Sequence, residues 1–287
     1  MDENIGSFLS WSETQLTQAG VYSPRLDSEI LLAHTLKLSR SELFIHSKRV
    51  LNEAEKNFAE INVKRRQKRE PVSLITGHQE FWSLDFAVDE NVLIPRPETE
   101  LLIETALNSI SSASKNILDL GTGSGVLAVI MAKEIQDCKV TAIEIDPKAL
   151  NIAKENATNH GTGDRIKFLC RDLTVAGWEG PYSMILSNPP YIPSADIERI
   201  MPEVQYYEPR KALDGGVMGM DFYKTIIPRA IDQLEENGIL ILEIGHSQAY
   251  AVTALLNQAS GFQKIEVIKD YSGYDRVVKA QKGSSDG

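Results

Sequence analysis

Two short motifs in this chain have residue types and an order that could perform chemistry together. Asn188-Pro189-Pro190-Tyr191 follows an apolar run, Tyr182 to Ser187, and a glycine-rich turn, Gly121-Thr122-Gly123-Ser124-Gly125, lies earlier in the chain. The first motif can hold a planar nitrogen, and the second can cradle a nucleotide-like cofactor. Together they predict an enzyme that moves a methyl group onto an amide or ring-amine nitrogen.

The Asn-Pro-Pro-Tyr motif offers oxygen acceptors to a weak nucleophile. An amide nitrogen attacks poorly because its lone pair is delocalised into the carbonyl, so acceptors aimed at its N–H groups keep electron density on nitrogen. The side chain of Asn188 and the backbone carbonyl of Pro189 can provide them, and Tyr191 offers a flat face for a planar group. Alignment and electrostatics then suffice without a strong general base. The alternative is a proline-rich turn in which Asn188 caps its own backbone.

The glycine-rich turn comes between an expected strand and an expected helix. Its pattern, G-x-G-x-G, is not the dinucleotide fingerprint G-x-G-x-x-G, because Val126 stands where the third glycine would be. A G-x-x-x-x-G-K-[ST] phosphate loop is also missing from the sequence. Asp119, just before the glycines, can orient the turn or meet an ammonium group. S-adenosylmethionine carries an ammonium group and no pyrophosphate, so it suits this turn better than a dinucleotide.

Two further acids end expected strands beside the turn. Glu144 ends the second strand of the alternating region, where a carboxylate can accept both ribose hydroxyls of a nucleoside. Asp172 ends the third strand, where it or its neighbour Leu173 could meet an adenine ring. Each acid alone could be an ordinary exposed strand end. Three acids on three successive strands, with Asp119 as the first, favour a shared cofactor site.

The elements that must position these residues alternate regularly. Because parallel strands alternate with covering helices, we predict an α/β fold with a mostly parallel sheet, and ligands in such sheets bind at the carboxyl ends of the strands. The expected strands cover residues 116–120, 139–145, 166–170, 182–187, 238–244, 262–268 and 276–280, and the expected helices cover 125–135, 147–159, 222–234 and 248–258.

The N-terminal part has a different pattern, which predicts helices. Ser23-Pro24 is typical of a helix start, and Ser39 with Glu42 fits a capping box. A last helix is expected over 51–69, and its cationic end is interpreted as solvated, with a contact to an acidic partner or RNA as the alternative.

Residues 81–88 alternate and are aromatic, which favours a strand or hairpin. Two prolines, Pro95 and Pro97, then precede a helix that begins at Glu98 or Thr99. These changes predict a helical domain over 1–75, a hairpin linker over 76–95 and a catalytic domain over 96–287.

Composition narrows the class of protein. The chain has 287 residues, 42% hydrophobic and 24% charged, and no apolar run approaches the roughly 20 residues that span a bilayer. The N-terminus is acidic and unlike a signal peptide, and the two cysteines, Cys138 and Cys170, form no disulfide framework, so we expect a cytoplasmic protein. His34 and His46 have no paired ligand nearby, and no metal is expected.

The net charge of −10 falls on the part that carries the motifs. Residues 1–80 hold eleven basic and eleven acidic side chains, whereas residues 81–287 hold 19 basic and 29 acidic ones. A protein that binds duplex nucleic acid usually presents a positive surface to the phosphates. This distribution makes a nucleic-acid partner unlikely, without excluding a local basic patch.

The sequence as a whole resembles the bacterial release-factor glutamine methyltransferase family, of the PrmC/HemK type. The most specific piece is Ile94-Pro95-Arg96-Pro97-Glu98-Thr99-Glu100, since the Asn-Pro-Pro-Tyr motif also occurs in adenine, guanine and ribosomal-protein methyltransferases. Other shared segments are Phe81–Leu84, Asp119–Gly125, Tyr207–Pro209, Leu242–Gly245, Asp270-Tyr271 and Asp275–Val277.

The resemblance implies a Rossmann-like class I methyltransferase sheet of seven strands with a small helical N-terminal domain. It also implies S-adenosylmethionine as donor, S-adenosylhomocysteine as product, and the glutamine of the Gly-Gly-Gln loop of class 1 peptide chain release factors as acceptor, methylated at N5. Many relatives have aspartate at the position of Glu144, and some have an aromatic residue at that of Leu173. The implied donor-binding residues are Asp119, Gly121, Thr122, Gly123, Ser124, Gly125, Glu144, Asp172, Leu173 and Asn188, and the implied glutamine-binding residues are Asn188, Pro189, Pro190 and Tyr191.

Other readings stay open at this point. One alternative is that the chain methylates a glutamine of a ribosomal protein, as a close relative of the family does. The segment from Arg96 to Glu100 favours the release-factor branch. An adenine or guanine methyltransferase is a second class, and a non-catalytic cofactor-binding module is a third. We also expect a monomer whose N-terminal helices contact the body of the release factor, because a large protein substrate needs contacts beyond one side chain.

Overall fold

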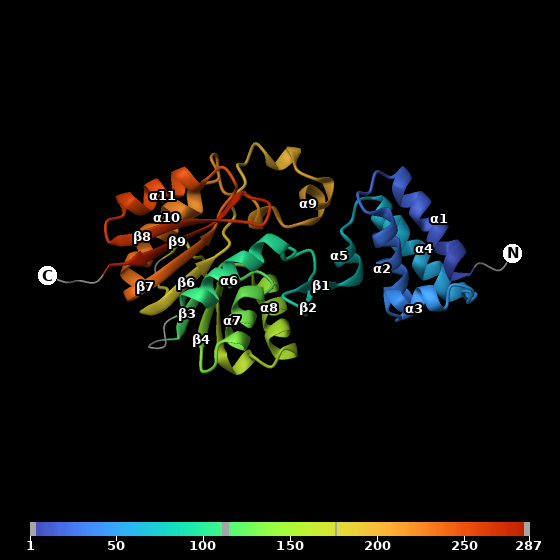
Figure 1. Ribbon diagram of the computed structural model, residues 1–287, viewed down its shortest axis with the longest axis horizontal. Helices are drawn as coiled ribbons and strands as arrows, with labels where there is room; N and C mark the ends of the chain where they lie inside the picture. The colour runs from blue at the N-terminus through green and yellow to red at the C-terminus, as the bar shows by residue number, and fades with distance from the viewer. Residues whose placement is uncertain (1–3, 111–114, 176, 284–287) are drawn as a thin grey trace. The chain divides into compact units, whose positions relative to one another are not determined.

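The computed structural model describes residues 4–110, 115–175 and 177–283. Its residues form two compact units. The first unit runs to His78 and includes a separate segment, Met201–Tyr207, while the second comprises Gln79–Ile200 and the chain from Glu208 onward. Figure 1 labels the elements in chain order.

The second unit is built on the expected seven-stranded sheet. Its strand order is β5-β4-β3-β6-β7-β9-β8, and only β9 runs antiparallel to its neighbours. The predicted mostly parallel α/β fold is therefore confirmed. The strands are β3 (Asn116–Leu120), β4 (Lys139–Glu144), β5 (Ile166–Cys170), β6 (Tyr182–Ser187), β7 (Leu234–Glu243), β8 (Phe262–Lys269) and β9 (Asp275–Lys282).

Strand order brings the two motifs to one place. The chain leaves β3 toward β4 and β5 and then returns to place β6 on the other side of β3, which makes a topological switch point. Leu120 at the end of β3 is paired in register with Ser187 at the end of β6. The glycine turn and the Asn-Pro-Pro-Tyr motif therefore start from adjacent points at the same edge of the sheet.

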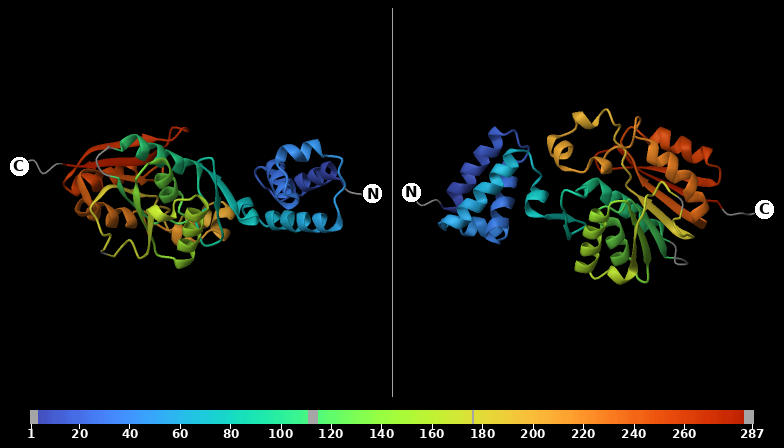
Figure 2. Two further views of the ribbon diagram at one scale, coloured as in Figure 1. Left: turned by 90° about the horizontal axis from the view of Figure 1, so that it is seen from below. Right: turned by 180° about the vertical axis from the view of Figure 1, so that it is seen from behind.

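Helices cover both faces of this sheet, as Figures 1 and 2 show. On one face α6 (Glu100–Ser109), α7 (Val126–Glu134) and α8 (Pro147–Asn159) pack into one apolar cluster; on the other, α10 (Asp221–Gln233) and α11 (Ala249–Gln258) pack into a second. The seven residues Val126 to Ala132 are all buried, which explains why this helix has little amphipathic character.

In the part of the chain that the structure describes, no helix is long and apolar enough to cross a membrane. Single 3₁₀ turns lie at Pro97–Thr99, Gly163–Arg165, Ile197–Arg199 and Arg210–Ala212.

The hairpin expected over 81–88 is present, but its position differs. Its strands are β1 (His78–Phe81) and β2 (Leu84–Ala87), so the turn falls within the expected strand, at Trp82 and Ser83. Both turn residues have positive φ, 55° and 56°, as a two-residue hairpin turn of the mirror-image type requires. The carboxylate of Glu100 accepts the Trp82 N–H at 2.8 Å. Sequence reasoning missed this turn because neither residue is a glycine or an asparagine.

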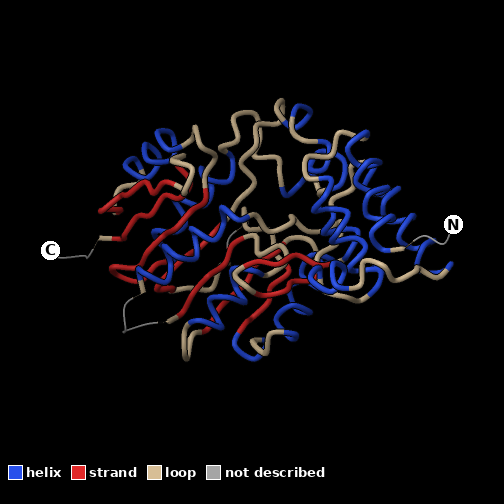
Figure 3. The backbone as a smooth tube through the Cα atoms, turned by 45° about the vertical axis from the view of Figure 1, so that its right-hand side comes forward, coloured by secondary structure: helices blue, strands red, loops and turns tan. Residues whose placement is uncertain are grey.

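The first unit is helical, and Figure 3 draws it as helices joined by loops. The capping box of Ser39 and Glu42 is confirmed, whereas the side chain of Ser23 makes no capping hydrogen bond. The last long helix is shorter than predicted, because Asn52 caps its start. The helices are α1 (Ile5–Gln18), α2 (Pro24–Leu36), α3 (Arg40–Ile45), α4 (Glu53–Gln67), α5 (Val72–Thr76) and α9 (Pro202–Tyr207).

The cationic end of α4 binds α9, a helix that the sequence did not predict. Arg66 is buried and pairs with Asp27 at 2.7 Å and with Glu203 at 3.0 Å. Arg69 holds the same Glu203 carboxylate through two hydrogen bonds of 2.6 and 2.8 Å. The interpretation of this helix end as solvated is therefore wrong for these two arginines. Their acidic partner lies within the chain, more than 130 residues away.

We predict that Glu203→Ala destabilises the first unit. The substitution removes one carboxylate from two arginines, one of them buried, which typically costs about 3 kcal/mol. Hydrogen exchange of the α4 amides should therefore become faster, while Glu198→Ala, which removes an exposed acid from a nearby turn, should leave it unchanged. Equal exchange in the two variants would contradict the assignment of Glu203 as an anchor.

Candidate active site

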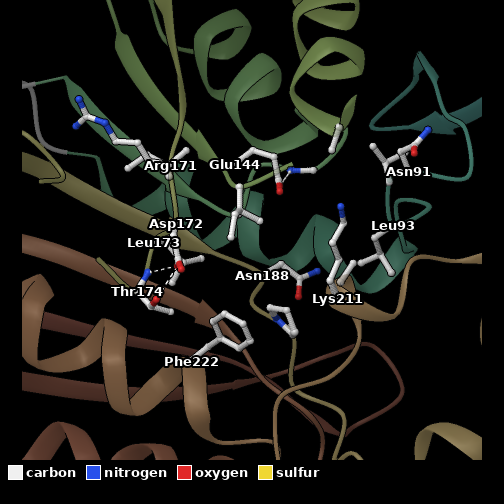
Figure 4. Close-up of a pocket in the computed structure, with 18 residues that line it drawn as sticks. Asn91, Leu93, Glu144, Arg171, Asp172, Leu173, Thr174, Asn188, Lys211 and Phe222 are labelled. Atoms are coloured by element: carbon white, nitrogen blue, oxygen red, sulfur yellow. Dashed lines mark hydrogen bonds between the residues drawn. The ribbon is translucent and has the colours of Figure 1, made fainter. Parts of the chain in front are cut away.

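A cavity of about 260 Å³ opens at the carboxyl ends of β3, β4, β5 and β6. Figure 4 shows Glu144, at the end of β4, and Asn188, just after β6, pointing into this space, with Leu173 and Phe222 at another side. Seven predicted site residues line it: Gly121, Gly123, Glu144, Asp172, Leu173, Asn188 and Pro190. Residues that sequence reasoning did not assign also line it, among them Asn91, Leu93, Arg171, Thr174, Lys211 and Phe222.

The other predicted site residues do not line the cavity. Asp119, Thr122, Ser124 and Pro189 are buried, Tyr191 is partly buried, and Gly125 is the residue just before α7. A Cβ atom at Gly125 would lie 3.0 Å from both Cα and Cβ of Ala153 in α8, and its φ of 85° also favours glycine. This glycine therefore serves the close packing of α7 on α8. Its predicted role in cofactor binding stays a prediction.

Glu144 is held in place before any ligand binds. One carboxylate oxygen accepts the N–H of Gly123 at 3.1 Å, and the other accepts the N–H of Asp146 at 3.0 Å. Burial raises the pKa of the carboxyl group, and the hydrogen bond from Gly123 opposes that shift. The side chain thus links the glycine turn to the end of β4 and presents a fixed acceptor to the cavity.

Asp119 is a buried acid beneath the glycine turn. One of its oxygens accepts the Thr122 hydroxyl at 2.6 Å, while Oδ1 has no hydrogen-bond partner among the described residues. Burial raises the pKa of Asp119 to about 7, against the smaller opposing effect of the Thr122 hydrogen bond. A buried carboxyl with an unpaired oxygen is costly to keep, and it would be stabilised in its ionised form by a cation bound nearby.

The third acid has a different environment. Asp172 accepts hydrogen bonds from the N–H and the hydroxyl of Thr174, at 2.7 and 2.6 Å, so its side chain organises its own turn. Leu173 is almost fully buried, and Phe222 also faces the cavity (Figure 4). Phe222 is therefore an aromatic side chain that lines the cavity together with Leu173, where the sequence predicts contact with an adenine ring. Sequence reasoning missed Phe222 because it lies about fifty residues away, at the start of α10.

Asn188 has a defined side-chain orientation. Its Nδ2 donates to the hydroxyl of Thr99 at 3.2 Å, so its carboxamide oxygen is the atom left for a ligand. Thr99 is only 3% exposed and comes from the segment before α6 that carried the most specific resemblance. The sequence indicated that segment but not its hydrogen bond to Asn188.

Tyr191 lies against a second glycine-rich loop. Its hydroxyl is 3.4 Å from Oε1 of Glu243, and burial raises its pKa, so it remains protonated and cannot act as a base near neutral pH. Its backbone carbonyl accepts from Gln248 at 2.9 Å. A Cβ atom at Gly219 would lie 2.2 Å from that same carbonyl oxygen. The loop before α10 thus fixes the backbone after Pro190, a role signalled only by the glycines at 215, 216 and 219.

Comparison with known proteins shows to which family the chain belongs. The PrmC N-terminal domain matches residues 7–77 and the methyltransferase small domain matches residues 97–204. A "Release factor glutamine methyltransferase" of Geobacter sulfurreducens is 40% identical over 97% of this chain and 97% of its own. The chain belongs to this family. The release factor glutamine methyltransferase of Rhodospirillum rubrum is 38% identical, over 97% of this chain and 85% of its own.

Solved structures agree on the fold of this methyltransferase. A methyltransferase from Pyrococcus furiosus matches 71% of this chain and 91% of its own, with a TM-score of 0.53 at 20% identity. The catalytic domain of hMettl16, solved with an RNA hairpin, matches 78% and 83% with a TM-score of 0.59 at 16% identity. The class I methyltransferase fold and the predicted enzyme class are confirmed. Among the residues that the structure describes, no cluster of three His, Cys, Asp or Glu side chains could hold a metal ion.

We predict that binding of S-adenosylmethionine releases protons near neutral pH. Asp119 has a pKa of about 7, so it is mostly protonated at pH 6, and a bound cation favours its ionised form. Affinity should therefore fall as the pH is lowered from about 8 to about 6, by up to about tenfold per unit. Calorimetry in buffers of different ionisation enthalpy measures the released protons. Asp119→Asn should abolish this release, and release that persists unchanged in this variant would assign it to another group.

Proposed function

We propose that this enzyme transfers the methyl group of S-adenosylmethionine to the side-chain N5 of the glutamine in the Gly-Gly-Gln motif of class 1 peptide chain release factors. One observation supports this most directly. Asn188, with its carboxamide oxygen available, shares a cavity with the glycine turn and with Glu144. Relatives of nearly equal length carry the name release factor glutamine methyltransferase.

The donor side of the cavity fits S-adenosylmethionine. When bound, this cofactor supplies an electrophilic methyl group on a sulfonium. Glu144 would accept the ribose hydroxyls, and Leu173 with Phe222 would hold the adenine ring between apolar surfaces. Asp119, with its unpaired oxygen, would stabilise positive charge above the glycine turn. Asp172 retains one carboxylate oxygen that Thr174 does not use, which could meet the adenine amino group.

The acceptor side would work by holding the amide. As the nitrogen attacks, it gains positive charge and its N–H groups become stronger donors. Oxygens of Asn188 and Pro189 aimed at these groups would therefore bind the transition state more tightly than the ground state. Pro190 lines the cavity and stiffens this segment. Tyr191 stays protonated, so its contribution would be a flat packing surface and not proton transfer.

The helical unit would contribute contacts to the body of the release factor. Residues 1–75 are proposed as this recognition domain, residues 76–95 as the linker and residues 96–287 as the catalytic domain. The unit exposes several large apolar side chains that could form such contacts, namely Tyr22, Phe44, Ile45, Phe58 and Ile61. The expected monomeric state and cytoplasmic location stay predictions.

An acceptor panel tests this function. Purified enzyme with labelled S-adenosylmethionine should methylate an intact class 1 release factor and not its Gly-Gly-Ala variant, ribosomal protein or DNA. A Gly-Gly-Gln peptide should react with a lower kcat/KM than the intact factor, because it lacks the proposed contacts to the helical unit. Label on DNA or ribosomal protein alone would overturn the assignment, and equal kcat/KM for peptide and factor would contradict the role of the helices.

We predict that Asn188→Ala impairs turnover far more than donor binding. Loss of a preorganised group that acts in the transition state typically lowers kcat by about 100-fold or more. The dissociation constant of S-adenosylmethionine should change by less than about threefold. Asn91→Ala is the matched control, since Asn91 lines the same cavity but is hydrogen-bonded to Asp89. Parallel losses of turnover and donor affinity in Asn188→Ala would contradict the acceptor role.

A further inference from the structure

A buried glutamine beyond the carboxyl end of β7 holds the backbone of the Asn-Pro-Pro-Tyr motif. Gln248 lies just before α11 and is 8% exposed. Its Nε2 donates to the carbonyl of Tyr191 at 2.9 Å and to the carbonyl of Gly219 at 3.0 Å. Its Oε1 accepts the N–H of Gly245 at 2.9 Å. One side chain therefore joins the motif, the loop before α10 and the segment after β7.

The orientation of the Gln248 carboxamide follows from these partners. The two carbonyls can only accept hydrogen bonds, and the N–H of Gly245 can only donate one. A flipped carboxamide would place its oxygen against two oxygens and its NH₂ against an N–H group. The arrangement therefore has one stable direction, in which both hydrogens of Nε2 face carbonyl oxygens. A buried side chain with all its polar atoms paired is well suited to fix its neighbours.

The motif needs such contacts because of its two prolines. A proline has no N–H group, so neither of them can donate a backbone hydrogen bond to the surrounding structure. In front of the prolines, the segment is held by the hydrogen bond from Asn188 to Thr99 at 3.2 Å. Behind them, Gln248 holds the carbonyl of Tyr191. The prolines thus lie between two side-chain hydrogen bonds that come from other parts of the fold.

The loop before α10 approaches this backbone with no side chain in between. A Cβ atom at Gly215 would lie 2.7 Å from the carbonyl oxygen of Pro190, and one at Gly219 would lie 2.2 Å from that of Tyr191. The N–H of Gly215 also donates to the carbonyl of Ile192 at 2.9 Å. These contacts set the distance between loop and motif, and the glutamine sets the direction of the Tyr191 carbonyl.

The direction of that carbonyl matters for chemistry on an amide nitrogen. The Tyr191 peptide group is joined through one residue to the carbonyl of Pro189, and it carries the ring of Tyr191. If this peptide group rotated, the ring and the proline carbonyls would move with it. Reacting groups must be aligned for transfer, and a displacement of about 1 Å can cost about 100-fold in rate.

We propose that Gln248 is a positioning residue for methyl transfer, which fixes the backbone of the Asn-Pro-Pro-Tyr motif so that its oxygens meet the acceptor amide. This inference rests on the proposed function, in which Asn188 and Pro189 receive the N–H groups of the glutamine substrate. Gln248 is not among the residues that line the cavity. It acts through Tyr191 and touches neither donor nor acceptor.

Kinetics of matched glutamine variants, measured well below the unfolding temperature of each, test this role. Gln248→Met keeps the length of the side chain but removes its hydrogen bonds. It should lower kcat about tenfold, the effect of losing one positioning hydrogen bond, with KM for release factor and donor affinity within about threefold. Gln233→Met is the matched control, because Gln233 accepts the N–H of Gly180 at 2.9 Å, near the opposite end of β6.

A second variant shows which half of the carboxamide matters. Gln248→Glu keeps an acceptor for the N–H of Gly245 but turns another acceptor toward the carbonyls of Tyr191 and Gly219. It should therefore lose at least as much kcat as Gln248→Met. Wild-type kcat in Gln248→Glu would assign the role of the side chain to Gly245 and overturn the proposal. Equal losses in Gln248→Met and Gln233→Met would overturn it too, since they would reflect general destabilisation.

Nuclear magnetic resonance observes the contact without turnover. The Tyr191 carbonyl and the Ile192 nitrogen share one peptide group, so a hydrogen bond to that carbonyl affects the amide nitrogen chemical shift of Ile192. This shift should change in Gln248→Met and stay constant in Gln233→Met. A constant shift in both variants would show that Gln248 does not hold the motif.

The acceptor used by the wild type separates this inference from the proposed function. If the wild type labels another acceptor instead of release factor, the proposed function is wrong, and the kcat ratios with that acceptor decide the role of Gln248. If the wild type methylates release factor and Gln248→Met retains kcat, the positioning is wrong and the function stands. A wild type that labels no acceptor would refute both.

Discussion

The site depends on one backbone pairing, the parallel register between β3 and β6. Leu120 opposite Ser187 brings two chain segments that diverge from neighbouring strand ends into a common cavity. One segment is the glycine turn, and the other carries Asn188. A shift of this pairing by one residue would turn each side chain to the opposite face of the sheet. The apolar side chains of both strands, packed between two helical layers, therefore fix the geometry of the chemistry above them.

Around this pairing, buried or half-buried acids lie where the strands end. Asp119, Glu144 and Glu243 end or nearly end β3, β4 and β7, and burial raises the pKa of each. Two of them keep an oxygen without a hydrogen-bond partner in the described structure. Such groups make the fold less stable than apolar residues of similar size would at the same positions. Of the three, Glu144 lines the cavity, where it is an acceptor held in place before a ligand arrives. Such a preorganised group is what electrostatic catalysis requires.

Local sequence signals predicted much of this structure. The helix over 147–159 has the bounds that the sequence indicated, because Asp146-Pro147 is a strong start signal, and the strand 182–187 was equally clear. Nonlocal contacts could not be predicted in this way. Thr99 and Asn188 are 89 residues apart, and their hydrogen bond follows from tertiary packing and not from any spacing. Phe222 reaches the cavity for the same reason. The sequence thus identified the residues at strand ends but not the ones that fix their orientation.

The location of α9 affects how experiments on truncated forms of this enzyme are interpreted. Met201–Tyr207 is grouped with the first unit, although both flanking segments belong to the second, so the backbone passes between the units three times. A shortened protein that starts after the hairpin would still carry Glu203, but without Arg66 and Arg69. The segment Met201–Tyr207, which would then lack these partners, begins only ten residues after Tyr191. Reduced activity of such a fragment would therefore be explained equally well by misfolding of the loop that follows the catalytic motif and by loss of a docking surface.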